Sequence, residues 1–237
     1  KSFANAKIGS LTFNNNDNQS LTIKNQAFQN IEINGNNKGV SIPANVAEIG
    51  ESAFENAKIN SLIFEENSKI TMIKSDAFKS NDLVTLILPN SLETIGSGAF
   101  SNNISLKDVN LPINNNYKSI SSDLFSGNTN LININIPANV TEIGENAFSN
   151  NSSLKAIEIP ANVVSIGNGA FSECPALGIT ERDFINNSNA NFNWCNIFYN
   201  KNYSSCTIET EGINTYIKYP ELQDKIIVKG GAIENEQ

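Results

Sequence analysis

Residues 148–171 read FSNNSSLKAIEIPANVVSIGNGAF, and this stretch decides the fold of the chain. Its closing pattern, Ile-Gly-x-x-Ala-Phe, recurs in complete or looser copies along the sequence. The phenylalanines that end these copies are Phe28, Phe54, Phe78, Phe100, Phe125, Phe148 and Phe171, at intervals of 22 to 26 residues. A period of this length is typical of a solenoid, in which short coils stack along one axis.

One unit of the repeat contains a short strand. Leu154, Ile157 and Ile159 form the pattern Leu-x-x-Ile-x-Ile, and residues 131–136 repeat it in the unit before. Successive side chains of a strand point to opposite faces, so we expect these residues to point into the coil and the residues between them to face solvent. Strands of successive coils then pair in parallel, and each coil covers the apolar face of its neighbour.

Three further positions of the repeat are nearly constant. Proline ends the strand at Pro43, Pro89, Pro112, Pro137 and Pro160, where its missing N–H stops the hydrogen-bond ladder. Three residues after the last five of these phenylalanines stand Asn81, Asn103, Asn128, Asn151 and Cys174. A stacked asparagine can bond to backbone groups of the turn that regular secondary structure leaves unpaired. Glycine after the isoleucine indicates a positive φ or a close approach of two backbones, although Lys74 and Ser121 occupy the same position.

Together these patterns resemble the treponemal or BspA-like class of leucine-rich repeats, over about residues 2–177. The resemblance implies an α/β repeat solenoid, a right-handed arc with a parallel β-sheet on its concave face and short helical or irregular turns on its convex side. Members of this class are typically secreted or surface proteins, and many are described as adhesins. The resemblance therefore implies an extracellular or cell-surface location and a host matrix or cell-surface protein as the partner.

The repeat pattern fades after Leu177, which divides the chain into two parts. We predict a leucine-rich repeat solenoid of about eight coils in residues 1–184 and a small β-rich C-terminal cap and tail in residues 185–237. The first coil is truncated, because the chain begins inside a repeat, and we expect a fragment from which a leader was removed. Aromatic residues after the last coil, including Trp194, are expected to cover that coil or, alternatively, to form an exposed binding patch.

Charge and composition exclude several classes of partner. The chain carries 16 basic and 24 acidic residues, for a formal net charge of −8, and has no basic run. Nucleic acid and anionic membranes attract clustered lysine and arginine, so we expect neither as a partner. The sequence contains no stretch suited to direct membrane insertion. We expect a monomer that binds protein.

The absence of histidine excludes most catalytic and metal sites. Without it, Ser-His-Asp and Cys-His systems, His-based metal centres and the commonest general base are all unavailable. The acidic residues are scattered over turns, which disfavours the carboxylate pair of a glycosidase. We therefore predict that the chain is not an enzyme and that it holds no metal and no cofactor.

The three cysteines differ in their sequence context. Cys174 replaces the repeated asparagine and is expected to be a buried thiol. Cys195 and Cys206 either form a disulfide in an oxidising compartment or pack as two separate thiols. Several Asn-x-Ser/Thr triplets, among them those at Asn103 and Asn151, match the glycosylation acceptor.

The outward residues of the predicted strands form the candidate binding surface, which we call the strip. Its central members are Ser61, Ile63, Thr85, Ile87, Asp108, Asn110, Asn133, Asn135 and Glu158, and it continues through Ser10, Thr12, Gly39, Ser41 and Ala156. Ile63 and Ile87 are neighbours that either seed an apolar contact or are singly tolerated on the surface. Insertions at residues 31–38 and 114–117 offer a second candidate site.

From the sequence we expect a non-catalytic, adhesin-like module that binds host matrix or cell-surface macromolecules through the concave strip. A solenoid presents such an extended face to proteins or peptides. Two alternatives remain open. One is a structural spacer or display stalk without a concave ligand, and the other is an intracellular protein-interaction scaffold.

Overall fold

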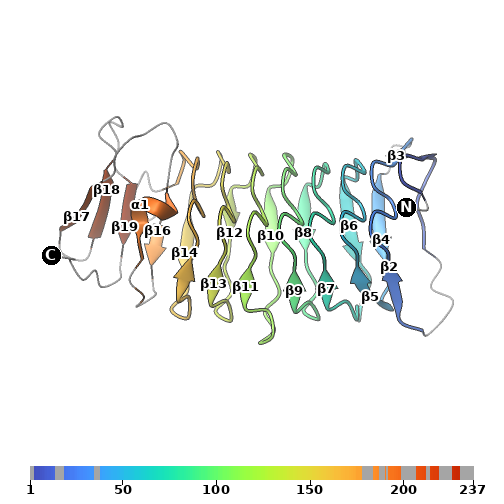
Figure 1. Ribbon diagram of the computed structural model, residues 1–237, viewed down its shortest axis with the longest axis horizontal. Coiled ribbons are helices and arrows are strands. Elements are labelled where there is room, and N and C mark those ends of the chain that lie inside the picture. The colour runs from blue at the N-terminus through green and yellow to red at the C-terminus, as the bar shows by residue number, and fades with distance from the viewer. Residues whose placement is uncertain are drawn as a thin grey trace.

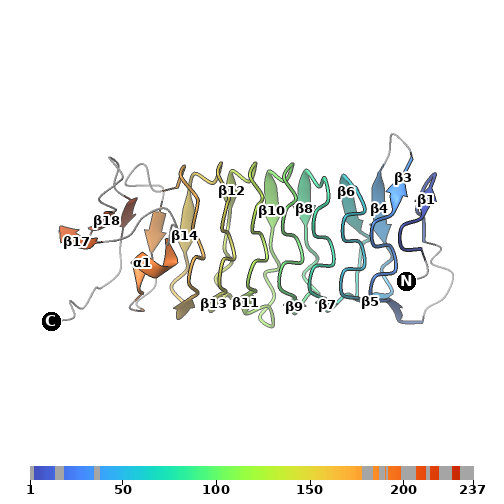
Figure 2. The same ribbon diagram turned by 45° about the horizontal axis from the view of Figure 1, so that its top comes forward.

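The computed structural model describes residues 3–13, 19–34, 38–177, 184–186, 190, 192–198, 207–211, 214–218 and 226–229. Short coils lie side by side along the long axis of the molecule, and the stack bends little (Figure 1, Figure 2). This confirms the predicted repeat solenoid. The turns are irregular rather than helical, because α1 (Trp194–Ile197) is the single helix within the described ranges.

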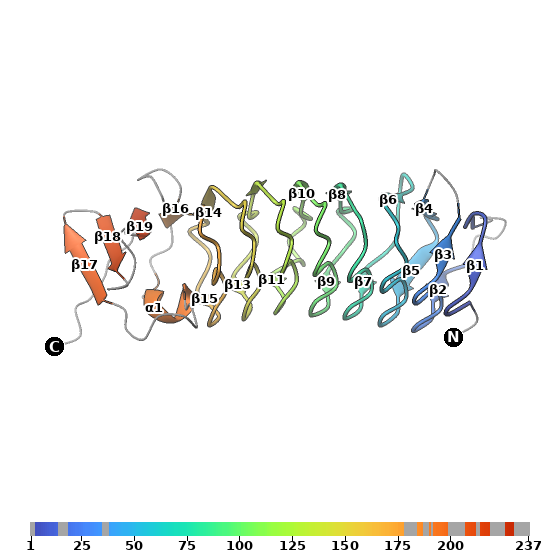
Figure 3. The same ribbon diagram turned by 90° about the horizontal axis from the view of Figure 1, so that it is seen from above.

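Each coil contributes strands to two parallel rows, which Figure 3 separates clearly. The first row is β4 (Gly39–Ile42), β6 (Ser61–Phe64), β8 (Thr85–Ile87), β10 (Asp108–Asn110), β12 (Asn133–Ile134), β14 (Ile157–Ile159) and β16 (Phe184–Asn186). The second row is β2 (Leu21–Ile23), β5 (Val46–Ile49), β7 (Met72–Ile73), β9 (Thr94–Ile95), β11 (Ser119–Ile120), β13 (Glu142–Ile143) and β15 (Ser165–Ile166). A further pair, β1 (Lys7–Ile8) and β3 (Glu32–Ile33), lies near the N-terminal end. The first row is the predicted sheet, whereas the second row was not predicted.

The first row is in register, but its ladder is interrupted between β6 and β8, and among the described residues only an isolated bridge joins β12 to the coil of β14. Asp108 of β10 lies opposite Thr85 and Asn133, and Asn110 lies opposite Ile87. Among the described strands, no backbone hydrogen bond joins β6 to β8, although the two are neighbours.

A stack of phenylalanine rings fills the interior beside the turns. It runs through Phe3, Phe28, Phe54, Phe78, Phe100, Phe125, Phe148, Phe171 and Phe198, with neighbouring ring centroids 5.0–6.1 Å apart. These spacings lie within the favourable range for offset aromatic pairs. Most of the rings are fully buried, whereas Phe3 at the N-terminal end is exposed. No coil could bury its own phenylalanine, so the stack couples each coil to the next.

Helix α1 takes the place of one further turn at the C-terminal end of this stack. The Phe171 N–H donates to the Ile197 carbonyl, just as the Phe148 N–H donates to the Ala170 carbonyl one coil earlier. Phe198, directly after α1, then packs on Phe171. Trp194 and Phe198 are buried, which supports the covering role expected of the aromatic residues.

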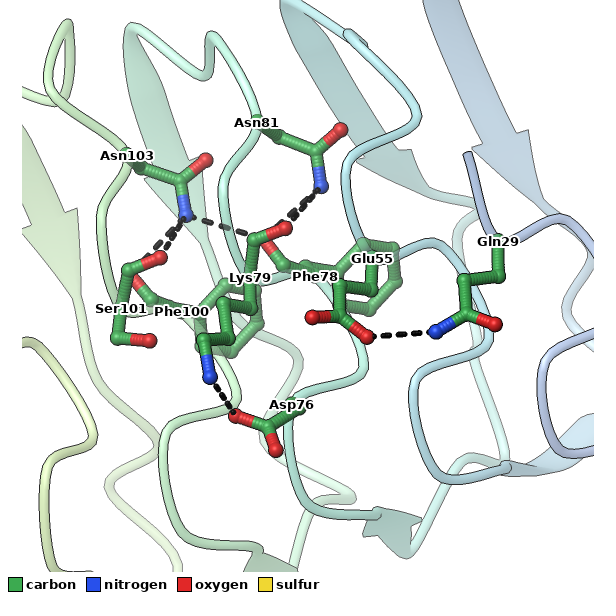
Figure 4. A network of polar contacts seen from close by, with 9 residues as sticks. All are labelled: Gln29, Glu55, Asp76, Phe78, Lys79, Asn81, Phe100, Ser101 and Asn103. Atoms are coloured by element: carbon green, nitrogen blue, oxygen red, sulfur yellow. Dashed lines mark hydrogen bonds and ion pairs between the residues drawn. The ribbon is translucent and has the colours of Figure 1, made fainter. Parts of the chain in front are cut away.

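Buried asparagines form the predicted ladder (Figure 4). The Asn103 side-chain amide donates to the carbonyl oxygens of Phe78 and Phe100, both at 3.0 Å. Asn81, Asn128 and Asn151 make the same pair of bonds, to their own phenylalanine and to that of the preceding coil. At the last rung, the Cys174 thiol donates to the Phe148 carbonyl at 3.1 Å.

A second asparagine ladder was not predicted. Asn45, Asn114, Asn139 and Asn162 each donate to a backbone carbonyl of the preceding coil. The recurring dipeptide Asn-Val, at Asn45, Asn139 and Asn162, is the sequence signal that could have revealed it. Both ladders satisfy backbone carbonyls in the segments between the strands.

The glycines after the isoleucine permit a close approach between coils. A Cβ on Gly50, Gly96, Gly144 or Gly167 would lie 2.4–2.5 Å from backbone nitrogen of the preceding coil. Of the two explanations offered for these glycines, close approach is therefore correct, and positive φ is wrong. Positive φ occurs elsewhere in the turn, before the alanine at Ser52, Asp76 and Asn146 and after the phenylalanine at Asn102 and Asn150. Asparagine and aspartate tolerate that conformation well.

A small sheet extends the first row at the C-terminal end. Strands β17 (Thr207–Glu211), β18 (Asn214–Lys218) and β19 (Ile226–Lys229) are antiparallel, and β19 pairs in parallel with β16. The division between residues 184 and 185 stays a prediction. It falls within β16, which pairs with β14 of the last coil.

Candidate interaction surface

The strip lies on the outward side of the first row. Ile63, Thr85, Ile87, Asp108, Asn110, Asn133, Asn135 and Glu158 are exposed, and Ser61 is half-buried. The residues between them, such as Leu86, Val109 and Ile134, are buried. The alternation of the strands therefore presents two outward side chains per coil. Parallel pairing brings Thr85, Asp108 and Asn133 into one line across three coils.

The outer members of the strip are less uniform. Ser10, Thr12 and Ser41 are exposed, whereas Gly39 and Ala156 are half-buried. The Asn133–Ala156 bridge continues the row from β12 toward β14. The well-presented part of the strip thus extends from β6 to β14.

Exposed aliphatic side chains gather around the middle of the strip. Ile63 is 56% exposed and Ile87 is 66% exposed. Val84, directly before β8, and Ile132, directly before β12, are also exposed. Sequence reasoning missed Val84 and Ile132. Both occupy an x position of the pattern Leu-x-x-Ile, which is expected to face solvent, so an apolar residue there indicates an exposed apolar side chain.

The charges of this face are few. Asp108 and Glu158 are the charged members of the strip, and Lys107 and Lys155 are exposed along its border. Within the described residues, the ion pairs lie elsewhere on the molecule: Lys7 with Glu32, Lys74 with Glu48, and Lys79 with Asp76. The last of these is drawn in Figure 4. Such exposed pairs contribute little to stability.

Two shallow polar hollows lie on the turn side of the coils. They share Asp123 and Ser126, and they continue to Asp76 on one side and Glu173 on the other. Burial raises the pKa of Asp123, and the nearby carboxylates of Glu145 and Asp76 raise it further. In the part of the chain with described side chains, no group of His, Cys, Asp and Glu is arranged to hold a metal ion.

The two insertions differ in how they are held. Tyr117 is fully buried at the position of Val140 in the next coil, and burial raises the pKa of its hydroxyl far above the usual range. Asn114 and Asn116 bond to Leu92 and Glu93 of the preceding coil. This insertion is therefore anchored rather than free. In the other insertion Ile31 and Ile33 are buried, and residues 35–37 lie outside the described ranges.

The structure also locates two of the cysteines and two of the glycosylation triplets. Cys174 is a free, buried thiol, and burial raises its pKa to about 12. Cys195 of α1 takes part in a disulfide. Cys206 lies outside the described residues, so the pairing of these two cysteines stays a prediction. Asn103 and Asn151 are fully buried ladder residues, so their triplets cannot be reached by a glycosyltransferase in the folded chain.

No helix found in the described ranges is long and apolar enough to span a membrane. The geometry of the strip suits an ordered binding face. The nucleophile–base pairs of hydrolases require histidine or an equivalent base, and the chain has no histidine.

Comparison with known proteins finds similar repeat proteins. A family model described as "BspA type Leucine rich repeat region (6 copies)" matches residues 1–117 and 71–204. A leucine-rich repeat protein from Bacteroides ovatus superposes with a TM-score of 0.54 at 24% identity, covering 78% of this chain and 55% of that one. No curated protein matches the chain.

Two other solved structures are similar at lower TM-scores. The pneumococcal vaccine antigen PcpA gives a TM-score of 0.48 at 21% identity, covering 79% of this chain and 59% of that one. A leucine-rich cell surface protein from Faecalibacterium prausnitzii gives 0.47 at 24% identity, covering 72% and 68%. The chain spans 55% to 59% of the length of the B. ovatus protein and PcpA.

Proposed function

The chain belongs to the BspA-type leucine-rich repeat family, and from this premise we propose that it is a non-catalytic protein-binding module of a secreted or cell-surface protein. Its proposed role is adhesin-like, with a host matrix or cell-surface macromolecule as the ligand and the strip as the binding face. The module acts as a monomer in this proposal.

The observation that carries the proposal is the ordered, outward presentation of the strip. Side chains from β6 to β14 stand on coils that the phenylalanine stack and the asparagine ladders hold in place. A face that is ordered before binding loses little backbone entropy on association. Many modest polar contacts can then sum across successive coils.

A disulfide, which is typical of an oxidising compartment, supports the extracellular part of the proposal. Cys195 takes part in a disulfide, and disulfides persist mainly in secreted and surface proteins. The same observation counts against an intracellular scaffold. A structural spacer stays the second candidate, because one uninterrupted stack of rings from Phe3 to Phe198 also suits a stiff stalk.

The test is surface binding of the purified chain to a panel of matrix and plasma proteins. The double variant Asn133→Lys, Asn135→Lys places two positive charges on the strip. The matched control, Thr94→Lys with Ser165→Lys, places the same charge on exposed residues of the second row.

Saturable binding that the strip variant loses and the control keeps supports the proposal. Equal loss in both variants would indicate a general charge effect. Absence of binding to every panel member would favour the spacer.

A further inference from the structure

We infer that the partner is anchored at the middle of the strip by an extended polypeptide segment that carries an aliphatic or aromatic side chain two residues away from a lysine or arginine. This inference rests on the proposed function and names the chemistry of its partner. The anchoring site, which we call the central patch, consists of Ile63, Ile87 and Asp108.

The first step concerns the two isoleucines. Ile63 and Ile87 each occupy the third position of their strands, and the strands β6 and β8 lie side by side (Figure 1). More than half of each side chain faces solvent, at 56% and 66%. The neighbouring outward positions on either side are polar, at Ser41 and Asn110. Two adjacent aliphatic side chains with a polar rim match the anatomy of a binding hot spot.

The second step concerns the interruption of the sheet. Ile63 and Ile87 lie on the two sides of the step at which no backbone hydrogen bond joins neighbouring strands of the described row. Both flanking steps, β4 to β6 and β8 to β10, are paired in register. The spacing of the two isoleucines is therefore not fixed by backbone hydrogen bonds between their own strands.

The third step concerns charge. Asp108 lies opposite Thr85, two residues before Ile87 on β8, so its carboxylate is a diagonal neighbour of the Ile87 side chain. It is exposed and has no ion pair among the described residues. The net charge of −8 further favours approach of a basic segment. Lys107, at the border of the strip, would repel a second basic residue of the partner on that side.

The spacing in the partner follows from strand geometry. With strands ~4.8 Å apart and residues ~3.3 Å apart along a strand, the diagonal from Ile87 to Asp108 is roughly 8 Å. Same-face side chains of an extended peptide are ~7 Å apart at positions i and i+2. An apolar anchor and a basic residue in the pattern anchor-x-basic, in either direction, therefore reach both groups.

The direct test uses methyl NMR of the chain labelled at isoleucine. The probe is a twelve-residue Ser/Thr-rich peptide with leucine and lysine two residues apart. Matched peptides replace the leucine with serine, replace the lysine with glutamate, or move the lysine to the adjacent position. We expect the methyl signals of Ile63 and Ile87 to shift with the first peptide, while those of buried Ile42 and Ile134 stay in place. The matched peptides should bind about tenfold more weakly.

The inference is overturned if the Ile63 and Ile87 signals stay unmoved at millimolar probe, or if the glutamate peptide shifts them equally. Variants make a second test with any panel protein that binds. Ile63→Asn with Ile87→Asn should weaken binding at least about tenfold, and Asp108→Asn about threefold with a reduced salt dependence. Val164→Asn is the control, because Val164 is equally exposed, at 66%, away from the strip.

The two proposals fail in different ways. Binding that Asn133→Lys, Asn135→Lys abolishes but the isoleucine variant keeps would leave the proposed function standing and overturn the central patch. Peptide binding at the central patch without binding to any panel protein would support the patch and remove matrix and plasma proteins as the ligand class.

Discussion

At the scale of single residues, the asparagine ladder concentrates stability in a few side chains. Asn103 is fully buried, and its amide serves carbonyls of two coils at once. The sequence predicted this role, because asparagine recurs three residues after phenylalanine. It did not predict the second ladder, because the recurring Asn-Val dipeptide shows the asparagines but not the carbonyl groups that the stacking of the coils brings beside them.

We expect Asn103→Ala to lower the free energy of unfolding by about 2–3 kcal/mol, since it leaves two buried carbonyls without a donor. Asn103→Cys should cost less, because Cys174 serves the same position with a thiol donor. Urea denaturation measures both. Asn110→Ala on the exposed strip is the control and should stay within about 0.5 kcal/mol of the unsubstituted chain. Equal effects at residues 103 and 110 would contradict the ladder.

Asp123 gives a pH-dependent prediction at the same scale. Burial, Glu145 and Asp76 raise its pKa in the folded chain above the usual 3.8. The folded state therefore binds this proton more tightly, and stability falls as pH rises from 3.8 through the folded pKa. Asp123→Asn should stabilise the chain at pH 7 by roughly 0.5 kcal/mol, and the gain should vanish below pH 3. Asparagine also suits the positive φ of this residue. Thermal unfolding at pH 7 and pH 2.5 measures the stability that Asp123→Asn adds. An equal gain at both pH values would exclude the loss of the Asp123 charge as its cause.

At the scale of elements, sequence reasoning found one row of strands and missed the other. The first row carries the alternating pattern Leu-x-x-Ile-x-Ile, which reads directly as a strand. Most strands of the second row have two residues, too few for alternation to be visible. The identity of the strip followed from the first row, but no feature of the sequence marks the interruption between β6 and β8.

The glycines of the second row show how closely the coils approach. The N–H groups of Gly50, Gly96, Gly144 and Gly167 donate over 2.7 Å, whereas the Lys74 N–H donates over 2.9 Å. At Ser121 the side-chain hydroxyl makes the bond, to Ile95. Positions without glycine are thus accommodated by a slightly wider step or by a different donor.

Gly96→Ala should therefore lower the free energy of unfolding by about 1–3 kcal/mol, because the new Cβ meets the Ser75 nitrogen at 2.4 Å. The control is Gly9→Ala, where a Cβ would meet nothing within 4 Å. Chemical denaturation compares the two. A neutral Gly96→Ala would mean that the coils move apart without cost.

At the scale of the whole molecule, stability is distributed along one dimension. Each coil touches mainly its neighbours, so a defect should act locally and not on a common core. The stacking of the coils in chain order could be predicted from the phenylalanine spacing. The role of α1 as a substitute turn could not, because residues 194–198 share only the phenylalanine with the repeat.

Phe198→Ala tests this view at the end of the stack. Loss of the last ring exposes Phe171, so amide exchange should accelerate over residues 148–171 and stay unchanged over residues 54–78. Phe100→Ala, at the centre, should accelerate exchange on both sides and cost about 3–5 kcal/mol. Hydrogen exchange by mass spectrometry resolves the segments. Uniform acceleration in Phe198→Ala would indicate a single cooperative unit instead.

The in-register first row also makes the strip a measuring scale. Its divisions are ~4.8 Å apart, whereas an extended chain laid along the stack advances ~3.3 Å per residue. Three residues of such a chain cover nearly the same length as two coils, so the residue spacing and the coil spacing coincide at every second coil. Because side chains of an extended chain point alternately to opposite faces, a residue returns to the same face and to the same place on a strand of the strip only every six residues, or four coils. A ligand sequence with a six-residue period would therefore stay in phase along the strip.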